Sequence, residues 1–486
     1  MKEDVKHKGQ VYTPISIVNM MLDYAGYVPS KQILWKHVMD NSCGDGRILG
    51  EVVKRYIQAS RDYGDGDLRV QLGKYIHGIE YDYDTRNECI AYLDSILKEN
   101  GIESIIWDIK WGNALDLKLN DRYLYQMDFV FGNPPYVRMK NIKKSDETNE
   151  DYQILKKYSF AEKGMSDLYL AFYQLGISMC KDGEGVMCYI APSAWINSQS
   201  GDMMRKFIKK TKWLSSVIDF EHIQVFDNAT TYVMITLFDM KPHQFVRYDK
   251  YDEGKKDFYP VLKIPYDRLF IDDKMYFVSQ DEYDFINNVN GEHPKRVEVK
   301  NGYATLADDV FIDDFPGFEK YTIPVLKAST LKWKYCLFPY DENLDLVSLE
   351  KIKETSPEVY NYLVEHAETL QKRTYDSKMI NDTWHSIGRS QGLKDTFVKK
   401  LSLNTLVKDK NDIKMNIVPA GSGVYSGLYI PIVDDIPPGE IAKLLRSDEF
   451  INYVKSLRKY KSGGYYTFSS KDVERYLNYM IEGLGL

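Results

Sequence analysis

Length, composition and charge already exclude several classes of protein. The chain has 486 residues, of which 44% are hydrophobic and 28% charged, and its net charge is −7. This length predicts two domains of about 200–250 residues each. No apolar run approaches the ~20 residues that cross a bilayer, and the first ten residues lack the apolar core of a secretory signal, so we expect a cytoplasmic protein. A mildly acidic total does not exclude a nucleic-acid partner, because such binding depends on local positive patches.

The five cysteines predict neither a zinc site nor a disulfide framework. Their number is odd, and no two of them form a CxxC pair or lie near a cluster of histidines. We therefore expect free thiols and no bound metal, with the cysteines at Cys43, Cys89, Cys180, Cys188 and Cys336.

Strand and helix patterns alternate through the first half of the chain. Short apolar runs typical of buried strands lie at residues 33–39, 75–79, 105–107, 129–131, 186–190, 214–218 and 232–238. Helical patterns separate several of them, at residues 47–59, 85–100 and 168–180. This alternation predicts an α/β fold with a doubly wound, mostly parallel sheet and helices on both faces. Ligands on such sheets bind at the carboxyl ends of the strands.

The pattern changes near Lys241-Pro242, so we expect a first domain at residues 1–240 and a second at residues 241–486. Turn-rich segments divide the second half into short mixed pieces, which predict a mixed α/β body. Helical patterns return at residues 357–372, 437–457 and 470–483.

The first chemical motif is the segment VMDNSCGDG at residues 38–46, a predicted strand that runs into a glycine-containing loop and then a helix. Glycine lets the backbone approach a cofactor closely, and the helix N-terminus favours an anionic group. The next strand ends in Glu80, whose carboxylate can accept both hydroxyl hydrogens of a ribose. The GxGxxG spacing of a dinucleotide site is absent, so this pattern alone is also typical of a structural turn between strand and helix.

A rarer motif follows at residues 128–136, DFVFGNPPY, where an apolar strand ends in Asn133-Pro134-Pro135-Tyr136. Two consecutive prolines fix an extended backbone and remove two amide donors. The Asn133 side-chain oxygen and the Pro134 carbonyl can then accept hydrogen bonds from one target. An NH2 group conjugated to a ring is a poor nucleophile, and two acceptors on its hydrogens favour a pyramidal nitrogen that can attack a methyl sulfonium. The Tyr136 ring offers a flat face for stacking.

In this order of motifs, residues 9–240 resemble the gamma-class N6-adenine DNA methyltransferases of the TaqI-like kind. The resemblance implies a Rossmann-like domain that uses S-adenosylmethionine, followed by a mixed α/β target-recognition domain. It places Thr13, from the motif GQVYTP, near the methionine end of the cofactor. Asp40 and Gly44 would lie at the cofactor loop, and Glu80 would hold the ribose.

The resemblance assigns further residues to the two ligands. Asn113 stands where the family usually has an aspartate that contacts the cofactor adenine, and an amide oxygen can still accept there without charge assistance. Phe172 and Pro135 would pack on that adenine, and Phe226 would stack on the target base opposite Tyr136. The expected cofactor site also includes Tyr12, Cys43 and Tyr81.

The implied reaction is site-specific methylation of the N6 amino group of an adenine in double-stranded DNA. The adenine must leave the base stack to reach a methyl donor. Asn133, Pro134, Tyr136 and Phe226 form the expected catalytic set, with direct transfer, no covalent enzyme intermediate and no metal. We expect a monomeric, stand-alone methylase, with any cognate restriction endonuclease encoded separately and no membrane partner.

Residues 241–486 are expected to read the DNA sequence. Arg389 and Gln391 could reach guanine or adenine edges, and residues 462–470 form a turn of small and aromatic residues. Basic runs at residues 138–144, 205–212 and 455–461 are candidate phosphate contacts, although each of them alone is more typical of a solvated face.

Three alternatives remain open at this point. The same catalytic motif serves N4 methylation of cytosine, whose enzymes more often have serine in place of Asn133. It also serves methyltransferases of release-factor glutamines or RNA guanines, which normally lack a C-terminal domain of this length. The third is a modification subunit, or a nonenzymatic cofactor-binding protein, that needs a partner for specificity.

Overall fold

The computed structural model describes residues 12–64, 66–137, 150–162, 167–226, 231–373, 383–389, 391–433 and 435–485. Three predicted features lie partly outside these residues. They are the start of the N-terminal motif at residues 9–11, the basic run at residues 138–144, and residues 227–230 beside Phe226.

The chain forms two compact units, Met1–Tyr283 and Asp284–Leu486. The division lies later than the expected boundary at residue 240. After Lys241-Pro242 the chain turns back as two more strands of the first sheet, and Tyr248 and Tyr266 are buried in the core of that unit. The proline therefore marks a turn between strands and not a linker between domains.

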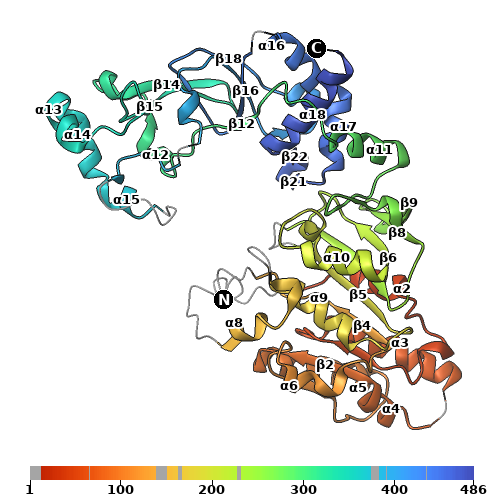
Figure 1. Ribbon diagram of the computed structural model, residues 1–486. Helices are drawn as coiled ribbons and strands as arrows, with labels where there is room; N and C mark the ends of the chain where they lie inside the picture. Colours follow the sequence, from red (N-terminus) through yellow and green to blue (C-terminus); the bar gives the residue numbers. More distant parts are fainter. Residues whose placement is uncertain are drawn as a thin grey trace. The chain divides into compact units, whose positions relative to one another are not determined.

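A nine-stranded sheet organises the first unit, in the order β3-β2-β1-β4-β5-β7-β6-β8-β9 (Figure 1). Its strands are β1 (Val38–Asp40), β2 (Ile76–Glu80), β3 (Asp108–Trp111), β4 (Phe129–Gly132), β5 (Val186–Pro192), β6 (Leu214–Asp219), β7 (Val233–Asp239), β8 (Phe245–Asp252) and β9 (Asp257–Pro265). The first five strands are parallel, β7 is antiparallel to β5 and β6, and β9 is antiparallel to β8. A short hairpin, β10 (Phe270–Ile271) and β11 (Lys274–Met275), follows the sheet.

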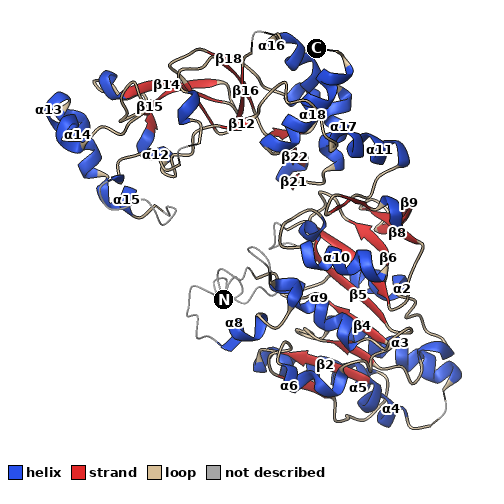
Figure 2. Ribbon diagram, viewed as in Figure 1, coloured by secondary structure: helices blue, strands red, loops and turns tan. Residues whose placement is uncertain are grey.

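Helices cover both faces of this sheet (Figure 2). They are α2 (Ile15–Tyr24), α3 (Arg47–Tyr63), α4 (Leu68–Tyr75), α5 (Tyr83–Glu99), α6 (Leu117–Asn120), α8 (Glu150–Leu155), α9 (Leu168–Met179) and α10 (Asp202–Thr211), and α11 (Gln280–Val289) spans the division between the units. Neighbouring strand residues point to opposite faces, so Val38 joins the core beneath α2, α3 and α5, whereas Met39 joins the core beneath α9 and α10. The predicted doubly wound α/β fold is confirmed.

Most predicted elements of the first unit appear within a few residues of their expected bounds. The third strand is displaced: the expected run at residues 105–107 precedes β3, which begins at Asp108. Ile106 is 94% exposed, so its apolar side chain does not mark a buried strand. Because β3 is an edge strand, polar residues such as Lys110 are tolerated in it, and the apolar pattern was a poor guide there.

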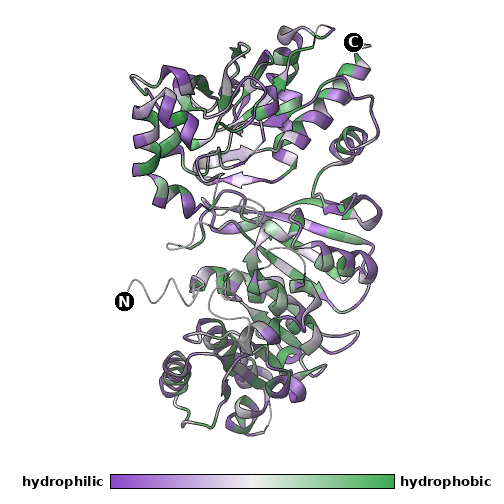
Figure 3. Cartoon of the chain, turned by 60° about the vertical axis from the view of Figure 1, so that its left-hand side comes forward, coloured by the Kyte–Doolittle hydropathy of each residue, from purple (hydrophilic) through white to green (hydrophobic). Residues whose placement is uncertain are grey.

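The second unit contains three small sheets, with orders β12-β20-β16-β18, β13-β15-β14-β19 and β17-β22-β21. The strands are β12 (Lys300–Asn301), β13 (Ile312–Asp313), β14 (Thr322–Lys327), β15 (Lys332–Leu337), β16 (Lys400–Leu403), β17 (Leu406–Val407), β18 (Ile417–Val418), β19 (Gly423–Tyr425), β20 (Leu428–Pro431), β21 (Tyr460–Lys461) and β22 (Tyr465–Thr467). The helices are α12 (Asp308–Phe311), α13 (Leu349–Thr355), α14 (Pro357–Glu365), α15 (Ala367–Gln371), α16 (Pro438–Leu445), α17 (Asp448–Ser456) and α18 (Ser470–Gly483). Figure 3 shows hydrophobic and hydrophilic residues side by side along its helices, as amphipathic packing requires.

Two of the three helices predicted in the second half are each divided in two. The pattern at residues 437–457 becomes α16 and α17, because the Ser447 hydroxyl accepts a hydrogen bond from Phe450 N and starts a new helix. The pattern at residues 357–372 is broken at His366, between α14 and α15, where no side chain of the N-cap residue caps the second helix. All five cysteines are buried and unpaired, as expected. None of the described helices is both long and apolar enough to cross a membrane.

Candidate active site

The topology of the first sheet places its ligand site at the ends of β1 and β4. The chain runs outward from β1 through β2 to β3, and then returns to the other side of β1 as β4. A crevice forms where the strand order reverses in this way. Asp40, the last residue of β1, pairs in register with Phe131 near the end of β4, so the two candidate motifs emerge side by side.

Glycine conformation shapes the loop between β1 and α3. Gly44 and Gly46 have φ angles of 54° and 87°, which lie in the left-handed region. A Cβ atom on Gly46 would lie 2.7 Å from the Cys89 Sγ, so any side chain there would collide with α5. Gly46, the N-cap of α3, has no side chain to cap the helix, so among the described residues backbone N–H groups at this end can bind an anionic group.

Glu80 ties this loop to the end of β2. Its Oε2 accepts a hydrogen bond from Gly44 N at 2.9 Å, and its Oε1 accepts one from Asp82 N at 2.9 Å. Burial raises the pKa of Glu80 above its usual value. Each carboxylate oxygen can accept a second hydrogen bond, which leaves Glu80 able to bind two ribose hydroxyls while it holds the loop.

Asp40 is a buried carboxyl group without a basic partner among the described residues. Its side chain is 1% exposed, and its Oδ1 accepts a hydrogen bond from Ser42 N at 3.0 Å. Burial raises the pKa of Asp40 to about 7, and the nearby Glu80 and Asp45 charges act in the same direction. A cationic ligand would relieve this arrangement, and S-adenosylmethionine carries both an ammonium and a sulfonium group. The residues therefore fit this cofactor.

The Asn133 amide is held at both ends. Its Nδ2 donates to Thr13 Oγ1 at 3.0 Å, and its Oδ1 accepts from the Tyr136 hydroxyl at 2.6 Å. Thr13 is buried, so the start of the described chain reaches the end of β4, 120 residues further along. Burial also raises the pKa of Tyr136 well above its usual value, which keeps its hydroxyl protonated.

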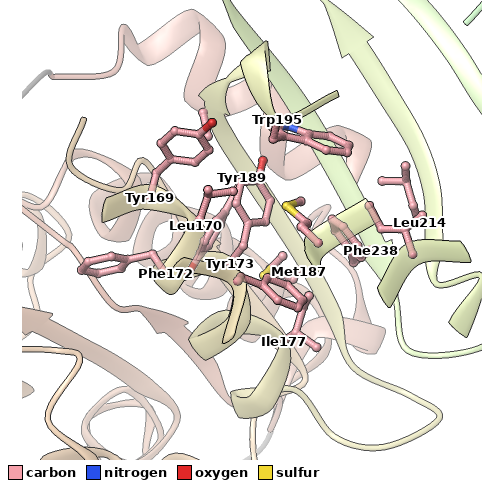
Figure 4. Close-up of a cluster of buried hydrophobic side chains, with 14 of the residues drawn as sticks. Tyr169, Leu170, Phe172, Tyr173, Ile177, Met187, Tyr189, Trp195, Leu214 and Phe238 are labelled. Carbon is pink, nitrogen blue, oxygen red and sulfur yellow. The ribbon is translucent and has the colours of Figure 1, made fainter. Parts of the chain in front are cut away.

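Tyr189, which sequence reasoning did not identify, packs against the Asn133 corner. A Cβ atom on Gly132 would lie 2.9 Å from the Tyr189 ring, and one on Gly176 would lie 2.6 Å from its hydroxyl. The Tyr189 hydroxyl donates to Asn41 Oδ1 at 2.8 Å, next to Asp40. Figure 4 shows Tyr189 within the packed cluster of α9 and β5. In the sequence Tyr189 is one apolar residue of a predicted strand, so nothing set it apart as a site residue. Gly132, just before Asn133, could have indicated close packing at this point.

Tyr136 and Phe226 come together, but not as a pair of parallel plates. Their ring centroids are 6.0 Å apart and the ring planes are tilted by 59°. A base between two rings would separate parallel planes by about 7 Å, twice the ~3.4 Å between stacked bases. The two rings therefore contact each other. The Tyr136 hydroxyl donates to the Asn133 oxygen, which was expected to accept a hydrogen bond from the substrate.

The remaining predicted cofactor residues are divided between buried and exposed positions. Phe172, on α9, is 6% exposed, and in Figure 4 its ring points away from Trp195. Asn113 follows β3, and its Oδ1 accepts a hydrogen bond from Leu115 N at 2.9 Å, so that oxygen already shapes a turn. The Cys43 thiol is buried in the core next to Gly78, so only the backbone of Cys43 can contribute to the cofactor loop.

Exposed aromatic rings gather at the ends of β2 and β3. Tyr81 is 64% exposed and Trp111 is 61% exposed, and the Trp111 indole donates to the Tyr81 carbonyl at 3.1 Å. Tyr12 is also exposed, with the Arg47 guanidinium 5.0 Å from its ring centroid. Sequence reasoning did not include Trp111 among the site residues, although a tryptophan at the end of a predicted strand could have indicated a ligand contact. Among the described residues, no three His, Cys, Asp or Glu side chains converge as a metal site would require.

The predicted DNA-contacting residues differ in their availability. Arg389 is exposed, and its backbone N donates to the Ala304 carbonyl at 3.0 Å. The Gln391 Nε2 donates to the Gly302 carbonyl at 3.0 Å, so that nitrogen holds the neighbouring segment. In the basic run at residues 205–212, Arg205 is buried and donates to the Ser198 carbonyl at 2.7 Å, which removes it from the candidate phosphate contacts.

Comparisons with known proteins indicate the class of this protein. Residues 67–226 match the family of Eco57I restriction-modification methylases. The chain is 25% identical over 427 residues to the type II methyltransferase M.BstVI of Geobacillus stearothermophilus, covering 78% of this chain and 74% of the relative. It is 24% identical to the type II restriction enzyme and methyltransferase RM.Eco57I of Escherichia coli, covering 88% of this chain and 53% of that protein. The chain thus spans about half the length of the Escherichia coli relative.

A solved structure resembles nearly the whole chain. The type IIL restriction-modification enzyme MmeI, in complex with DNA, superposes with a TM-score of 0.64 at 16% sequence identity, covering 94% of this chain and 63% of that one. Fold and site together define a methyltransferase that uses S-adenosylmethionine as methyl donor. The match to the Eco57I restriction-modification methylases includes Glu80 and the Asn-Pro-Pro-Tyr motif, whereas the loop at residues 40–46 lies before it.

Proposed function

We propose that the chain is a site-specific DNA methyltransferase that transfers a methyl group to the N6 amino group of an adenine flipped out of duplex DNA. The position of Asn133 carries this proposal. It stands at the end of β4 beside the end of β1, where the cofactor loop begins, and its amide is oriented by Thr13 and Tyr136. Methyltransferases of restriction-modification systems among the relatives support DNA as the substrate.

The cofactor would lie along the carboxyl ends of β1, β2 and β3. Asp40 would face its cationic end, the loop at Cys43 and Gly44 would approach it closely, and Glu80 would bind the ribose. Tyr81, Asn113, Phe172 and Pro135 would surround the adenine, with Tyr12 and Thr13 closing the methionine end. When bound, S-adenosylmethionine supplies an electrophilic methyl group on its sulfonium.

The protein's own part in the reaction is to hold the target nitrogen. The Asn133 oxygen and the Pro134 carbonyl accept the two amino hydrogens, which reduces conjugation with the ring and leaves the nitrogen lone pair free. Pro134 and Pro135 have no N–H groups, so the backbone at these two positions presents acceptors without donors. Neither residue takes up a proton, and the surplus amino proton passes to solvent.

Base entry requires Tyr136 to move. Its hydroxyl engages the Asn133 oxygen and its ring contacts Phe226. An entering adenine takes the place of that hydroxyl and slides between the two rings. Unstacking a base costs a few kcal/mol, and stacking on an aromatic side chain returns about 1–3 kcal/mol.

Methylation mapping tests the proposal. The chain would be expressed in a host without DNA methylation of its own, and modified bases in the host DNA would be located by sequencing. We expect N6-methyladenine at one short sequence, and no modification with Asn133→Ala. Methylation that persists at full level in Asn133→Ala would refute the assigned mechanism.

The same experiment separates the alternatives. N4-methylcytosine at a defined sequence would identify a cytosine-specific enzyme. Methylation that appears only when a second protein is co-expressed would identify a modification subunit with a separate specificity partner. The intact Asn133–Tyr136 corner, with asparagine in place of serine, favours adenine.

A further inference from the structure

The second unit contains a cleft of about 660 Å³ where its three sheets meet. One wall is the face of the β17-β22-β21 sheet that carries Tyr465 and Thr467. Asn301 of β12 and the turn at Ser426, between β19 and β20, also line the cleft. Thr405, in the segment after β16, is a further lining residue.

Strand register explains why this sheet face is polar. Leu406 pairs with Thr467 and Lys461 pairs with Tyr465, so these four residues share one face. The adjacent Val407 is 1% exposed and points to the other face, into the protein. The sheet is thus anchored on one side, and on the other side Tyr465 and Thr467 contribute a phenol and a hydroxyl to the lining of the cleft.

Several polar side chains that line the cleft are not needed for hydrogen bonds within the described part of the fold. Across the part of the chain that the structure describes, the side chains of Asn301, Thr405 and Thr467 form no intramolecular hydrogen bond. By contrast, the neighbouring Asn404 donates to the Leu406 and Asp412 carbonyls and accepts from Lys414 N, which fixes the loop. The fold therefore holds the backbone of the cleft rigidly while it leaves donors and acceptors unused.

Cations lie at the rim. The Lys408 ammonium lies 4.5 Å from the centroid of the Tyr465 ring, and Lys461 is exposed on the same sheet face. Neither lysine pairs with a carboxylate among the described residues. Lys414 and Asp412 both line the cleft, and the Lys414 Nζ donates to the Ser329 carbonyl at 2.9 Å.

We propose that this cleft is a base-reading site for duplex DNA, in which Asn301, Thr405 and Thr467 contact base edges while Lys408 and Lys461 contact phosphates. The proposal rests on the proposed function, since it assigns the recognition step of the same enzyme to a defined place. Base edges present donors and acceptors side by side, which matches a mixture of hydroxyl and amide groups. Pockets for small ligands are, in contrast, lined mainly by apolar side chains.

Salt-dependent binding tests the phosphate contacts and needs no catalysis. The full chain would be titrated against a fluorescent duplex of random sequence between 50 and ~200 mM salt, a range over which phosphate contacts dominate the change. With Lys408→Gln/Lys461→Gln, we expect the slope of log Kd against log salt to fall by about 2, because each lost phosphate contact removes about 0.9. The matched control is Lys320→Gln/Lys353→Gln, two lysines of the same unit that also lie over tyrosine rings. It should keep the wild-type slope.

Methylation mapping tests the base contacts. Thr405→Val and Thr467→Val replace a hydroxyl with a methyl group of the same shape, and Thr369→Val on α15 is the control. We expect each cleft variant to lose about 10-fold of its preference at one position of the recognition sequence, the scale of a base-specific hydrogen bond. The control should read the wild-type sequence.

The outcomes separate this inference from the proposed function. If the wild type methylates DNA and the cleft variants match it in both salt slope and sequence preference, the cleft is not the reading site. The wild type could instead show no methylation at all, while Lys408→Gln/Lys461→Gln still reduces the slope of log Kd against log salt. In that case the proposed function fails and the DNA contact stands.

Discussion

At the scale of single residues, the candidate site is defined by one amide whose two ends have different partners. Thr13 fixes the nitrogen of Asn133, so the oxygen must face Tyr136 and the crevice. The Tyr136 hydroxyl donates to the Asn133 oxygen, which is the acceptor that an adenine amino group would use. The sequence predicted both residues but not this contact, since spacing along the chain does not show which partner fills an acceptor before substrate arrives.

Variants of Tyr136 separate its ring from its hydroxyl. Tyr136→Ala should lower kcat/KM for DNA about 5- to 150-fold, because it removes a stacking contact of about 1–3 kcal/mol. Tyr136→Phe keeps the ring and should remain within a few-fold of wild type. Steady-state methyl transfer to duplex DNA measures both. An equal loss in the two variants would show that the hydroxyl, and not the ring, is the essential group.

The buried Asp40 predicts that cofactor affinity depends on pH. Burial raises its pKa to about 7, so in the free protein the carboxyl is mostly protonated at pH 6 and mostly ionised at pH 8. A bound cation favours the ionised form, so cofactor affinity should rise by about 10-fold between these pH values. Calorimetric titration with S-adenosylmethionine measures this. Asp40→Asn should bind more weakly at pH 8 and show a flat profile, and a flat wild-type profile would remove Asp40 from the cationic end of the site.

At the scale of elements, close packing of strands and helices sets the position of the Asn133 corner. Tyr189 of β5 fills the spaces left by Gly132 and Gly176, and its hydroxyl reaches the residue after β1. The order and types of these elements followed from hydrophobic periodicity and turn residues. The exact contact did not, because a buried tyrosine in a strand pattern looks like any other core residue.

A methyl group at Gly132 should therefore disturb the corner. Gly132→Ala would force the Tyr189 ring to move, at a cost of about 1–3 kcal/mol in the free energy of unfolding, and should reduce methyl transfer more than cofactor binding. Gly439→Ala is the control, since outside its own helix and chain neighbours no atom of the described residues lies within 4 Å of a Cβ there. The residue lies in the first turn of α16, so the substitution should leave the free energy of unfolding unchanged or raise it by up to about 0.5–1 kcal/mol. Thermal unfolding and transfer assays measure both. Unchanged transfer in Gly132→Ala would show that Tyr189 does not position Asn133.

At the scale of the whole molecule, the first unit extends beyond the point where the sequence suggested a domain boundary. Strands β8 and β9 continue the sheet past Lys241-Pro242, and Tyr248 and Tyr266 complete its core. A proline in a turn-rich stretch looks the same in a linker and in a connection between strands. Long-range pairing of β8 with β6 decides between them, and no local pattern reports it.

Truncation tests this boundary. A fragment of residues 1–283 should fold cooperatively and bind S-adenosylmethionine, because it contains the complete sheet. A fragment of residues 1–240 should aggregate or unfold, because it exposes the edge of β6 and the apolar face that β8 covers. Circular dichroism melting and calorimetric cofactor titration distinguish the two. A stable, cofactor-binding 1–240 fragment would instead make β8 and β9 dispensable additions.

The central claim is that Asn133 presents acceptors to the amino group of an adenine. It is tested most directly by incubating the purified chain with S-adenosylmethionine and duplex DNA and then identifying the methylated nucleoside by mass spectrometry. We expect N6-methyldeoxyadenosine from the wild type, and at least a ~100-fold lower yield from Asn133→Ala, the scale on which one transition-state hydrogen bond acts. N4-methyldeoxycytidine, or an undiminished yield from Asn133→Ala, would contradict it.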